Sequence, residues 1–396
     1  MSKLSQYRPL FVIGFLCLIF VQAGLVITGF SKVRPVTAAD FRSFYAAGYL
    51  IRTGHGEQIY DYNKTAATEA EVIGPEGANL PFIHPAYEGV LFAALSIFSY
   101  KKAFTLFFLV NLGLLVVVYR LMLPAAAWTR EIWSGLPALT IAGFLPVGAC
   151  LMQGQDSILF LAIVTVSYVL QKNQRDFLAG VVLGLGMFRF QLVIPLAICL
   201  CFGRRWKLSA GLAVACAIVA AISIAVTQPA SWMAYPRHLM AMNAGLQTEL
   251  EKLAHAIYPE KMPNLRGLFY LLLGTRVGSG TMQLLTAVAS VALMGWAIAK
   301  RLPFELLVVV AVLVSYHSAI HDSALLLLPL LKLPISLARG KRLLAWSLTI
   351  AAPALALFAF HAPLAVVSIV YLIFLAMMAK PASEAGEHMV LSRSMA

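Results

Sequence analysis

Residues 208–226 read LSAGLAVACAIVAAISIAV, a run of 19 residues without a charged side chain. Arg204, Arg205 and Lys207 stand directly before this run. About 20 apolar residues are enough for a helix to cross the hydrocarbon core of a bilayer, and basic residues collect in cytoplasmic loops. This stretch therefore predicts a transmembrane helix that begins on the cytoplasmic side.

The rest of the chain has the same character. Of its 396 residues 61% are hydrophobic and only 12% are charged, with a mean hydropathy of +0.83. A soluble domain is roughly half apolar, whereas the excess here lies in long uncharged runs that need lipid as their solvent. We therefore expect a single all-α polytopic membrane domain over residues 1–396, with membrane lipids as partners. The net charge of +13 is typical of Lys and Arg kept in cytoplasmic loops, so no nucleic-acid partner is expected.

Basic segments alternate with the apolar runs and set the expected topology. Segments 1–8, 171–176, 203–207 and 339–342 carry Lys or Arg and are expected in the cytoplasm. This alternation predicts about 12 transmembrane helices in a bacterial plasma (inner) membrane, with both termini cytoplasmic. The shortest apolar run, 89–99, is expected to be re-entrant or juxtamembrane.

Two long polar segments, 31–87 and 227–280, are expected to be large extracytoplasmic loops. Channels and simple transporters tend to have shorter loops. The chain also lacks an internal repeat of the kind found in many secondary transporters. Both features favour an enzyme over a transporter.

The expected topology gathers ionisable residues from four separate turns on the extracytoplasmic side. Charged residues near membrane depth are costly and are functional candidates by default. The four groups are Asp40 with Arg42, Gln155 with Asp156, Arg189 with Gln191, and His317 with His321 and Asp322.

These residue types suit one kind of chemistry. A carboxylate at the mouth of an apolar cavity can act as a general base toward an alcohol, because partial desolvation raises its pKa. An arginine can hold a phosphate through paired hydrogen bonds, and a histidine can bind the same phosphate. No Gly-rich nucleotide-binding loop is present. The pattern therefore favours transfer of a group carried on a lipid phosphate.

Each candidate also has a structural explanation. Asp40 is expected to cap the amphipathic stretch 41–51 if it has no chemical role. Arg42 and Arg52 would then anchor an interfacial helix. His84 would be an ordinary turn residue, and Asp156 a cap of the following helix.

Several short motifs, in order, resemble glycosyltransferase family 87. Asp40 followed by Tyr45-Ala46-Ala47-Gly48 is similar to the first external loop of that family. The resemblance covers about residues 10–335. Its other motifs are Gly56 with Ile59-Tyr60-Asp61, the segment 81–85 around His84, Gly154-Gln155-Asp156, Arg189-Phe190-Gln191, and His321-Asp322 before the leucine-rich stretch 325–329.

The resemblance implies a GT-C membrane enzyme that uses a polyprenyl-phosphate sugar, typically mannose, and inverts the anomeric centre. It implies that Asp40 is the catalytic base, and that Arg189 with His317 or His321 binds the donor phosphate. Arg189 stands where the family more often has Lys, and His84 replaces a more usual aromatic residue. The acceptor or cavity residues implied are Arg42, Tyr45, His84, Gln155, Asp156, Gln191 and Asp322.

The expected reaction moves a hexose, mannose by resemblance, from a polyprenyl-phosphate donor to a lipid or glycan acceptor. We expect no cofactor and no metal site, although Asp156 would be the residue to bind a divalent ion. Two alternatives remain open from the sequence. One is a flippase or secondary transporter of lipid-linked sugars, and the other is a non-catalytic subunit of a cell-envelope assembly.

Overall fold

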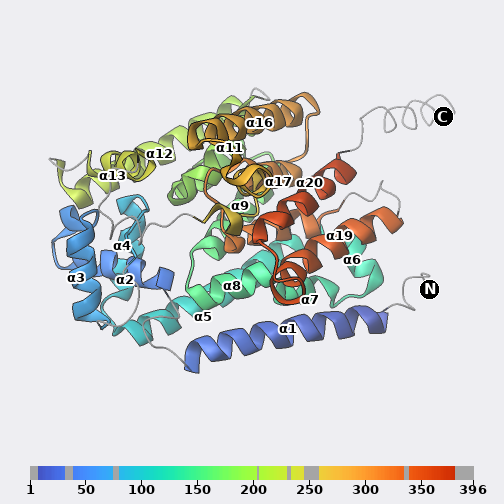
Figure 1. The fold of residues 1–396 in the computed structure, drawn as a ribbon, viewed down its shortest axis with the longest axis horizontal. Helices are drawn as coiled ribbons and strands as arrows, with labels where there is room; N and C mark the ends of the chain where they lie inside the picture. Colours follow the sequence, from blue (N-terminus) through green and yellow to red (C-terminus); the bar gives the residue numbers. More distant parts are fainter. Residues whose placement is uncertain are drawn as a thin grey trace.

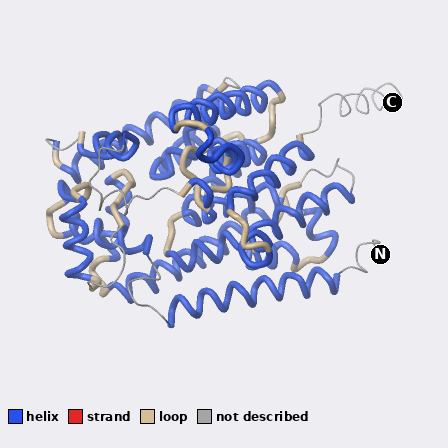
Figure 2. The backbone as a smooth tube through the Cα atoms, in the orientation of Figure 1, coloured by secondary structure: helices blue, strands red, loops and turns tan. Residues whose placement is uncertain are grey.

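The computed structural model describes residues 8–31, 39–74, 80–202, 205–229, 233–244, 258–333 and 339–379. Within these ranges every regular element is a helix (Figures 1 and 2). Both ends of the chain, on which the predicted cytoplasmic termini depend, lie outside the described residues. So does the stretch 245–257 of the predicted second loop.

Five helical segments are long and apolar enough to cross a membrane, and a bent pair makes a sixth if it counts as one span. The chain is therefore a polytopic membrane protein, but the predicted dozen crossings are not confirmed in the described part. Three of the five are single helices: α5 (Tyr100–Met122), α12 (Trp206–Thr227) and α16 (Ser279–Ala299). The other two combine several elements. Asp176–Cys201 consists of α10 (Asp176–Leu185), η3 (Gly186–Arg189) and α11 (Phe190–Cys201), and Gly340–Ala359 consists of most of α19 (Arg339–Ala354) and of η8 (Leu355–Ala359).

The bent pair consists of α7 (Leu136–Gly143) and α8 (Leu145–Gln153), which meet at 51°. Pro146 stands in the first turn of α8 and has no N–H to donate to the carbonyl of Ala142. The side chain of Gln22, from α1 (Arg8–Ser31), donates to that carbonyl at 3.0 Å instead. The break is therefore stabilised by a neighbouring helix, which is how irregular backbone is tolerated within a membrane protein.

A second interruption lies at the centre of the molecule. Helix α17 (Phe304–Val314) has only 11 residues, all of them buried, and is too short to cross the bilayer. A non-helical turn then leads into η7 (Ile320–Leu326) and α18 (Leu327–Leu331). Asn264 donates to the carbonyl of Ser315 at 2.8 Å, and the Ser315 hydroxyl donates to the carbonyl of His317 at 2.9 Å. These bonds replace the helical ones that the turn gives up.

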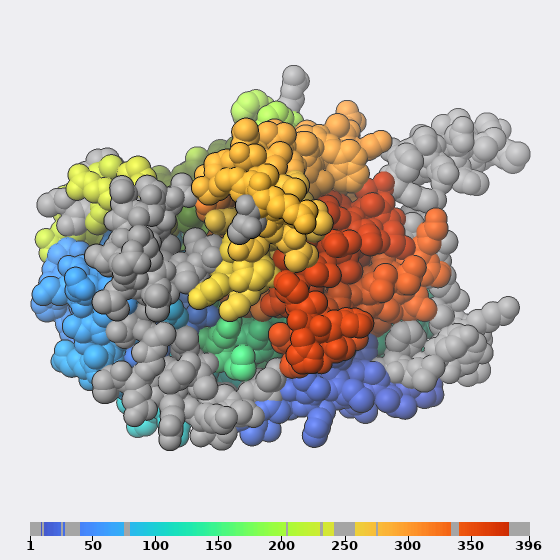
Figure 3. Space-filling model, viewed as in Figure 1, coloured from blue at the N-terminus to red at the C-terminus, as the bar shows by residue number. Residues whose placement is uncertain are grey.

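The described part of the predicted first loop is itself helical. It forms α2 (Ala39–Arg52), η2 (Gly56–Gln58) and α3 (Tyr62–Val72), and α4 (Ala86–Leu95) follows. The helices α2, α3 and α4 lie together at one end of the molecule (Figure 1), and α3 forms part of the surface there (Figure 3), whereas α2 is largely buried. Phe44 and Phe92 stack with ring centroids 4.7 Å apart in the apolar core between α2 and α4. With ten residues, α4 is too short to cross.

The predicted second loop also contains short helices in its described parts. Helix α15 (Leu265–Leu273) has nine residues and is too short to span a bilayer. The remaining described elements are α6 (Ala127–Ile132), α9 (Ser157–Lys172), α13 (Ala234–Ala244), η5 (Pro259–Lys261), η6 (Gly274–Arg276), η9 (Leu364–Val366) and α20 (Val367–Met378).

Candidate functional site

Arg189 lies at the end of η3, inside the Asp176–Cys201 segment, and is 3% exposed. Its Nε donates to Asp156 Oδ1 at 2.9 Å, and its Nη2 donates to the side chains of both Asp156 and Gln155. Its Nη1 lies 3.3 Å from Asp322 Oδ1. One buried guanidinium thus joins the turn before α9 to the start of η7.

Asp322 is fully buried and has hydrogen bonds on both carboxylate oxygens. Oδ1 accepts from the Ser157 hydroxyl at 2.8 Å, and Oδ2 accepts from the backbone N–H of Ala319 at 2.9 Å. Ser157 Oγ also lies 2.9 Å from His321 Nδ1. Half-buried His317, in the turn after α17, has Asp322, Arg189 and His321 as electrostatic neighbours.

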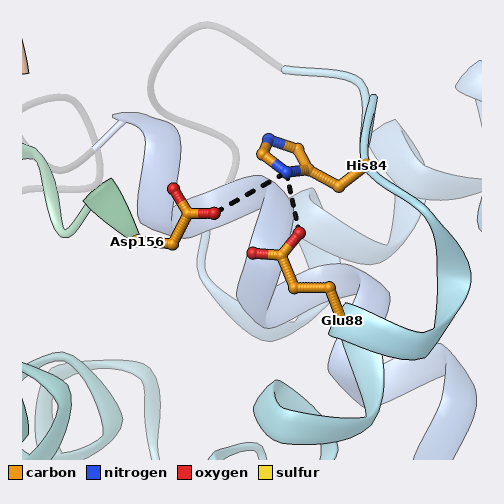
Figure 4. Close-up of side chains that lie close together, drawn as sticks. All are labelled: His84, Glu88 and Asp156. Atoms are coloured by element: carbon orange, nitrogen blue, oxygen red, sulfur yellow. Dashed lines mark ion pairs between the residues drawn. The ribbon is translucent and has the colours of Figure 1, made fainter. Parts of the chain in front are cut away.

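His84 and Glu88 lie on the other side of Asp156 (Figure 4). His84 Nδ1 is 2.7 Å from Glu88 Oε2 and 3.8 Å from Asp156 Oδ2. His84 precedes Pro85, whose ring disfavours helical backbone in the residue before it, and α4 begins directly afterwards. The Tyr60 hydroxyl donates to the carbonyl of His84 at 2.9 Å, so the segment between α2 and α4 also fixes this side of the cluster.

Local backbone chemistry places Asp156. Gly154 ends α8 with a φ of +63°, the left-handed conformation that favours glycine at a helix end. A Cβ at Gly154 would lie 2.7 Å from Cβ of Phe41, so side chains other than hydrogen do not fit. Asp156 then occupies the N-cap position of α9 but makes no capping bond. Its side chain binds Arg189 instead. Asp156 therefore has the predicted N-cap position but makes no capping hydrogen bond.

The charges of the cluster follow from burial and from Arg189. Burial lowers the pKa of His84 to about 3, so its imidazole is neutral. Burial by itself would raise the pKa of Asp156, but the adjacent guanidinium of Arg189 outweighs it and holds that pKa below its usual value. Burial and the neighbouring Asp156 raise the pKa of Glu88 well above its usual value. With the groups of this chain alone, Asp156 is ionised and Glu88 binds a proton.

The structure brings six of the predicted site residues into this one cluster, with His317 beside them. The six are His84, Gln155, Asp156, Arg189, His321 and Asp322. His84 was also open to interpretation as an ordinary turn residue, but it is buried and contacts two carboxylates.

Asp40 is the second residue of α2 and is half-buried. In the described part of the chain its carboxylate makes no hydrogen bond and no ion pair, although its carbonyl accepts from the Ser43 hydroxyl at 3.0 Å. Its neighbour Phe41 packs against Gly154, two residues before Asp156. The start of α2 is thus next to the cluster, and the role of Asp40 stays a prediction.

Three other predicted residues lie apart from the cluster. Arg42 is 1% exposed and forms an ion pair with Glu69 at 3.2 Å, so it does not anchor an interfacial helix. The Tyr45 hydroxyl donates to the carbonyl of Phe98 at 2.8 Å. Gln191 is half-buried in the first turn of α11.

The sequence analysis did not identify Glu69, Glu88 or Ser157 as polar partners. Glu88 follows His84 by four residues, a spacing that brings side chains together on a helix, and this was a usable signal. Glu69 and Ser157 had no such signal, because their partners lie 27 and 165 residues away.

An apolar groove of about 550 Å³ adjoins these elements. The Tyr87 hydroxyl in this groove donates to the carbonyl of Leu185 at 3.0 Å, which ties α4 to the end of α10. Tyr87 directly precedes Glu88, and Met187 and Phe190 lie on either side of Arg189 in the chain. The groove is lined among others by Tyr60, Tyr87, Met187, Phe190, Ile194 and Val219.

Comparison with known proteins gives one match. The sequence model of glycosyltransferase family 87 matches residues 82–320, more than half of the chain. This range contains His84, Asp156 and Arg189, while Asp40 precedes it and Asp322 follows it. No curated protein and no solved structure matches the chain. A polytopic membrane protein with this match is a membrane glycosyltransferase, and the chain belongs to glycosyltransferase family 87.

Proposed function

We propose that this enzyme moves a hexose, expected to be mannose, from a polyprenyl-phosphate donor to a lipid or glycan acceptor on the extracytoplasmic side. The observation that carries the proposal is the position of the polar cluster around Arg189 next to an apolar groove. A lipid-linked sugar needs both surfaces, because its phosphate is charged and its tail is apolar.

The groove suits the polyprenyl chain of the donor. Its lining is mainly aliphatic and aromatic, as in most sites for apolar ligands. Tyr87 and Met187 belong to this lining and are close in the chain to Glu88 and Arg189. A lipid tail held there would leave its phosphate near the polar cluster.

The donor phosphate is assigned in this proposal to Arg189 together with His317 or His321. Asp156 and Gln155 already accept hydrogen bonds from Nε and Nη2 of Arg189. Nη1, which carries two N–H groups and lies 3.3 Å from Asp322, is the part of the guanidinium with a donor left for a phosphate. His317 is half-buried whereas His321 is 6% exposed, so His317 is the more accessible of the two histidines.

Asp40 is the proposed general base. A base must have an oxygen free to accept the proton of the attacking hydroxyl. Asp156 and Asp322 are buried and contact Arg189, whereas Asp40 is half-buried and its carboxylate has no partner among the described residues. The deprotonated hydroxyl would attack the sugar C1 from the face opposite the phosphate and invert the anomeric centre. Arg189 and the histidine would stabilise the charge on the departing phosphate.

The experiment uses the purified full chain in lipid nanodiscs with radiolabelled polyprenyl-phosphate mannose and membrane-lipid acceptors. We expect Asp40→Asn to lower the transfer rate by roughly 10²–10⁴-fold, the usual contribution of a general base. Asp61→Asn is the matched control, because Asp61 caps α3 through the N–H groups of Asn63 and Lys64 and asparagine caps equally well.

Three results would contradict the proposal. Turnover of Asp40→Asn at the wild-type rate would exclude Asp40 as the base. Movement of the donor across a membrane without release of polyprenyl phosphate would identify a flippase instead. Absence of transfer by the wild type, together with alanine substitutions in the cluster that cause no phenotype in cells, would favour a non-catalytic subunit of an envelope assembly.

A further inference from the structure

The buried side chains of His84, Glu88 and Asp156 direct unsatisfied polar atoms toward one another (Figure 4). His84 Nδ1, both carboxylate oxygens of Glu88 and Asp156 Oδ2 have no hydrogen-bond partner of acceptable geometry. Both carboxylates are 0% exposed and His84 is 8% exposed. Buried polar atoms without partners are costly and call for a specific explanation.

The charges around these atoms do not balance. Three buried carboxylates, Asp156, Asp322 and Glu88, face one guanidinium, that of Arg189. If all three are ionised, two negative charges remain. A divalent cation beside Glu88 and Asp156 would compensate both charges.

The distances fit a metal site. One ligand atom from each of the three residues lies within 4.8 Å of the other two. A neutral imidazole and carboxylates are the ligands that Zn²⁺ and Mn²⁺ take in proteins. Asp156 contributes Oδ2 to this site while its Oδ1 binds Arg189, so the two interactions do not compete for the same atom.

We infer that His84, Glu88 and Asp156 bind one divalent transition-metal ion of the Zn²⁺ or Mn²⁺ type. Three protein ligands leave at least one coordination position open. Through Asp156 the ion would be coupled to Arg189, and so to the group that holds the donor phosphate under the proposed function. This inference departs from the expectation, based on the sequence, that the enzyme has no metal site. A proton shared between Glu88 and Asp156 is the competing explanation of the same geometry.

The test measures binding of the metal alone, with no donor or acceptor present. The full chain in nanodiscs is stripped with a chelator, incubated with Zn²⁺ or with Mn²⁺, separated from free metal and analysed by mass spectrometry. We expect one ion per chain, and a rise in Tm with metal concentration because the ion binds the folded state. Glu88→Gln, which has the shape of a protonated glutamate, should lose at least ten-fold in affinity.

Glu71→Gln is the matched control, because the same chemical change falls on an exposed residue of α3, and it should bind like the wild type. In the Mn²⁺ form, magnetic resonance should show a coupled histidine nitrogen that disappears in His84→Ala. If the stripped protein takes up neither ion, or Glu88→Gln binds as tightly as the wild type, the inference is wrong and the shared proton remains. Asp40→Asn should still bind the metal, which separates this result from failure of the proposed function.

Discussion

At the scale of single residues, Arg189 determines whether the buried cluster is stable. It contacts Asp156 and Asp322, and both carboxylates are 0% exposed. Removal of one partner from a buried ion pair leaves an uncompensated charge, and this costs more than the pair contributes. Its contacts with the two aspartates give Arg189 a structural role in addition to its proposed role in phosphate binding.

We therefore expect Arg189→Ala to lower the free energy of unfolding by about 3–5 kcal/mol. Arg189→Lys should cost less, because it keeps the charge but loses the paired geometry. Thermal unfolding in one detergent measures the change, with Arg175→Ala as a control at an exposed position. Equal stability of the Arg189→Ala and Arg175→Ala variants would show that the two aspartates do not need this guanidinium.

Glu69 makes the stability depend on pH. Burial raises its pKa to about 7, and Arg42 opposes this shift without cancelling it. In the unfolded chain the pKa of Glu69 lies near the ordinary value of a glutamate, 4.5. A raised pKa favours the protonated form in the folded state, so the contribution of Glu69 is fully present below pH 4.5 and is lost as the pH rises through about 7.

We expect Tm to fall less between pH 4.5 and pH 7 in Glu69→Gln than in the wild type, because the glutamine side chain does not titrate in this range. Parallel thermal scans at several pH values in one detergent test this expectation. Glu71→Gln, at an exposed position two residues away, should keep the wild-type dependence. A pH profile of Glu69→Gln identical to that of the wild type would contradict it.

Much of the candidate cluster could be predicted at this scale, because the basic segments indicate on which side of the membrane each turn lies. That reasoning placed Asp156, Arg189 and Asp322 on one side, and the structure joins them. Glu88 could not be predicted as a site residue, because it stands at the edge of an apolar run, where a single acidic residue is typical of a helix end. Its significance depends on Asp156, which comes from a distant part of the chain.

At the scale of elements, α10 and α12 pack through two glycines. A Cβ on Gly180 would overlap the carbonyl of Leu208, and a Cβ on Gly211 would overlap the carbonyl of Phe177. Small residues let membrane helices approach closely, and dispersion forces then act between the backbones. Gly113 in α5 differs, because a Cβ there meets nothing within 4 Å.

We expect Gly180→Ala and Gly211→Ala each to destabilise the protein by about 1–3 kcal/mol, the usual cost of overpacking. Gly113→Ala should be neutral or should stabilise by up to about 1 kcal/mol, because alanine favours helix more than glycine does. Thermal unfolding of the three purified variants compares them directly. If Gly180→Ala and Gly211→Ala are as stable as Gly113→Ala, then α10 and α12 do not pack closely at these two glycines.

The interruptions of helices were less predictable than the helices themselves. Pro146 indicates a break from its own chemistry, but nothing local names Gln22 as the partner of the freed carbonyl. The run 304–314 has the composition of a transmembrane helix, but α17 ends at Val314. There Asn264, 51 residues away from Ser315, donates a hydrogen bond to the Ser315 carbonyl. Such breaks depend on tertiary contacts that hydropathy does not contain.

At the scale of the whole molecule, composition was sufficient to predict an all-α membrane protein. Apart from closed barrels, only helices can satisfy the hydrogen bonds of the backbone in lipid. The number of crossings was not predictable in the same way. Several apolar runs become helices of 10–17 residues, and a run of that length spans, re-enters or lies in the core according to its neighbours. The side of the membrane on which the cluster lies depends on the basic segments alone.

The side of the membrane on which the cluster lies can be measured. Asn63, in α3, belongs to the predicted first extracytoplasmic loop, and Asn173 follows α9 in a predicted cytoplasmic turn; both are exposed. We expect Asn63→Cys to react with a membrane-impermeant maleimide in intact spheroplasts, and Asn173→Cys to react only after permeabilisation. The wild type, whose five cysteines lie in apolar runs, is the background control. The predicted topology has α9 cross the membrane, with Asp156 at one end and Asn173 at the other. If α9 crosses, the side on which Asn173 lies is opposite to that of the cluster. Labelling of Asn173→Cys from outside would place the cluster on the cytoplasmic side and would remove the basis for an extracytoplasmic lipid-linked donor.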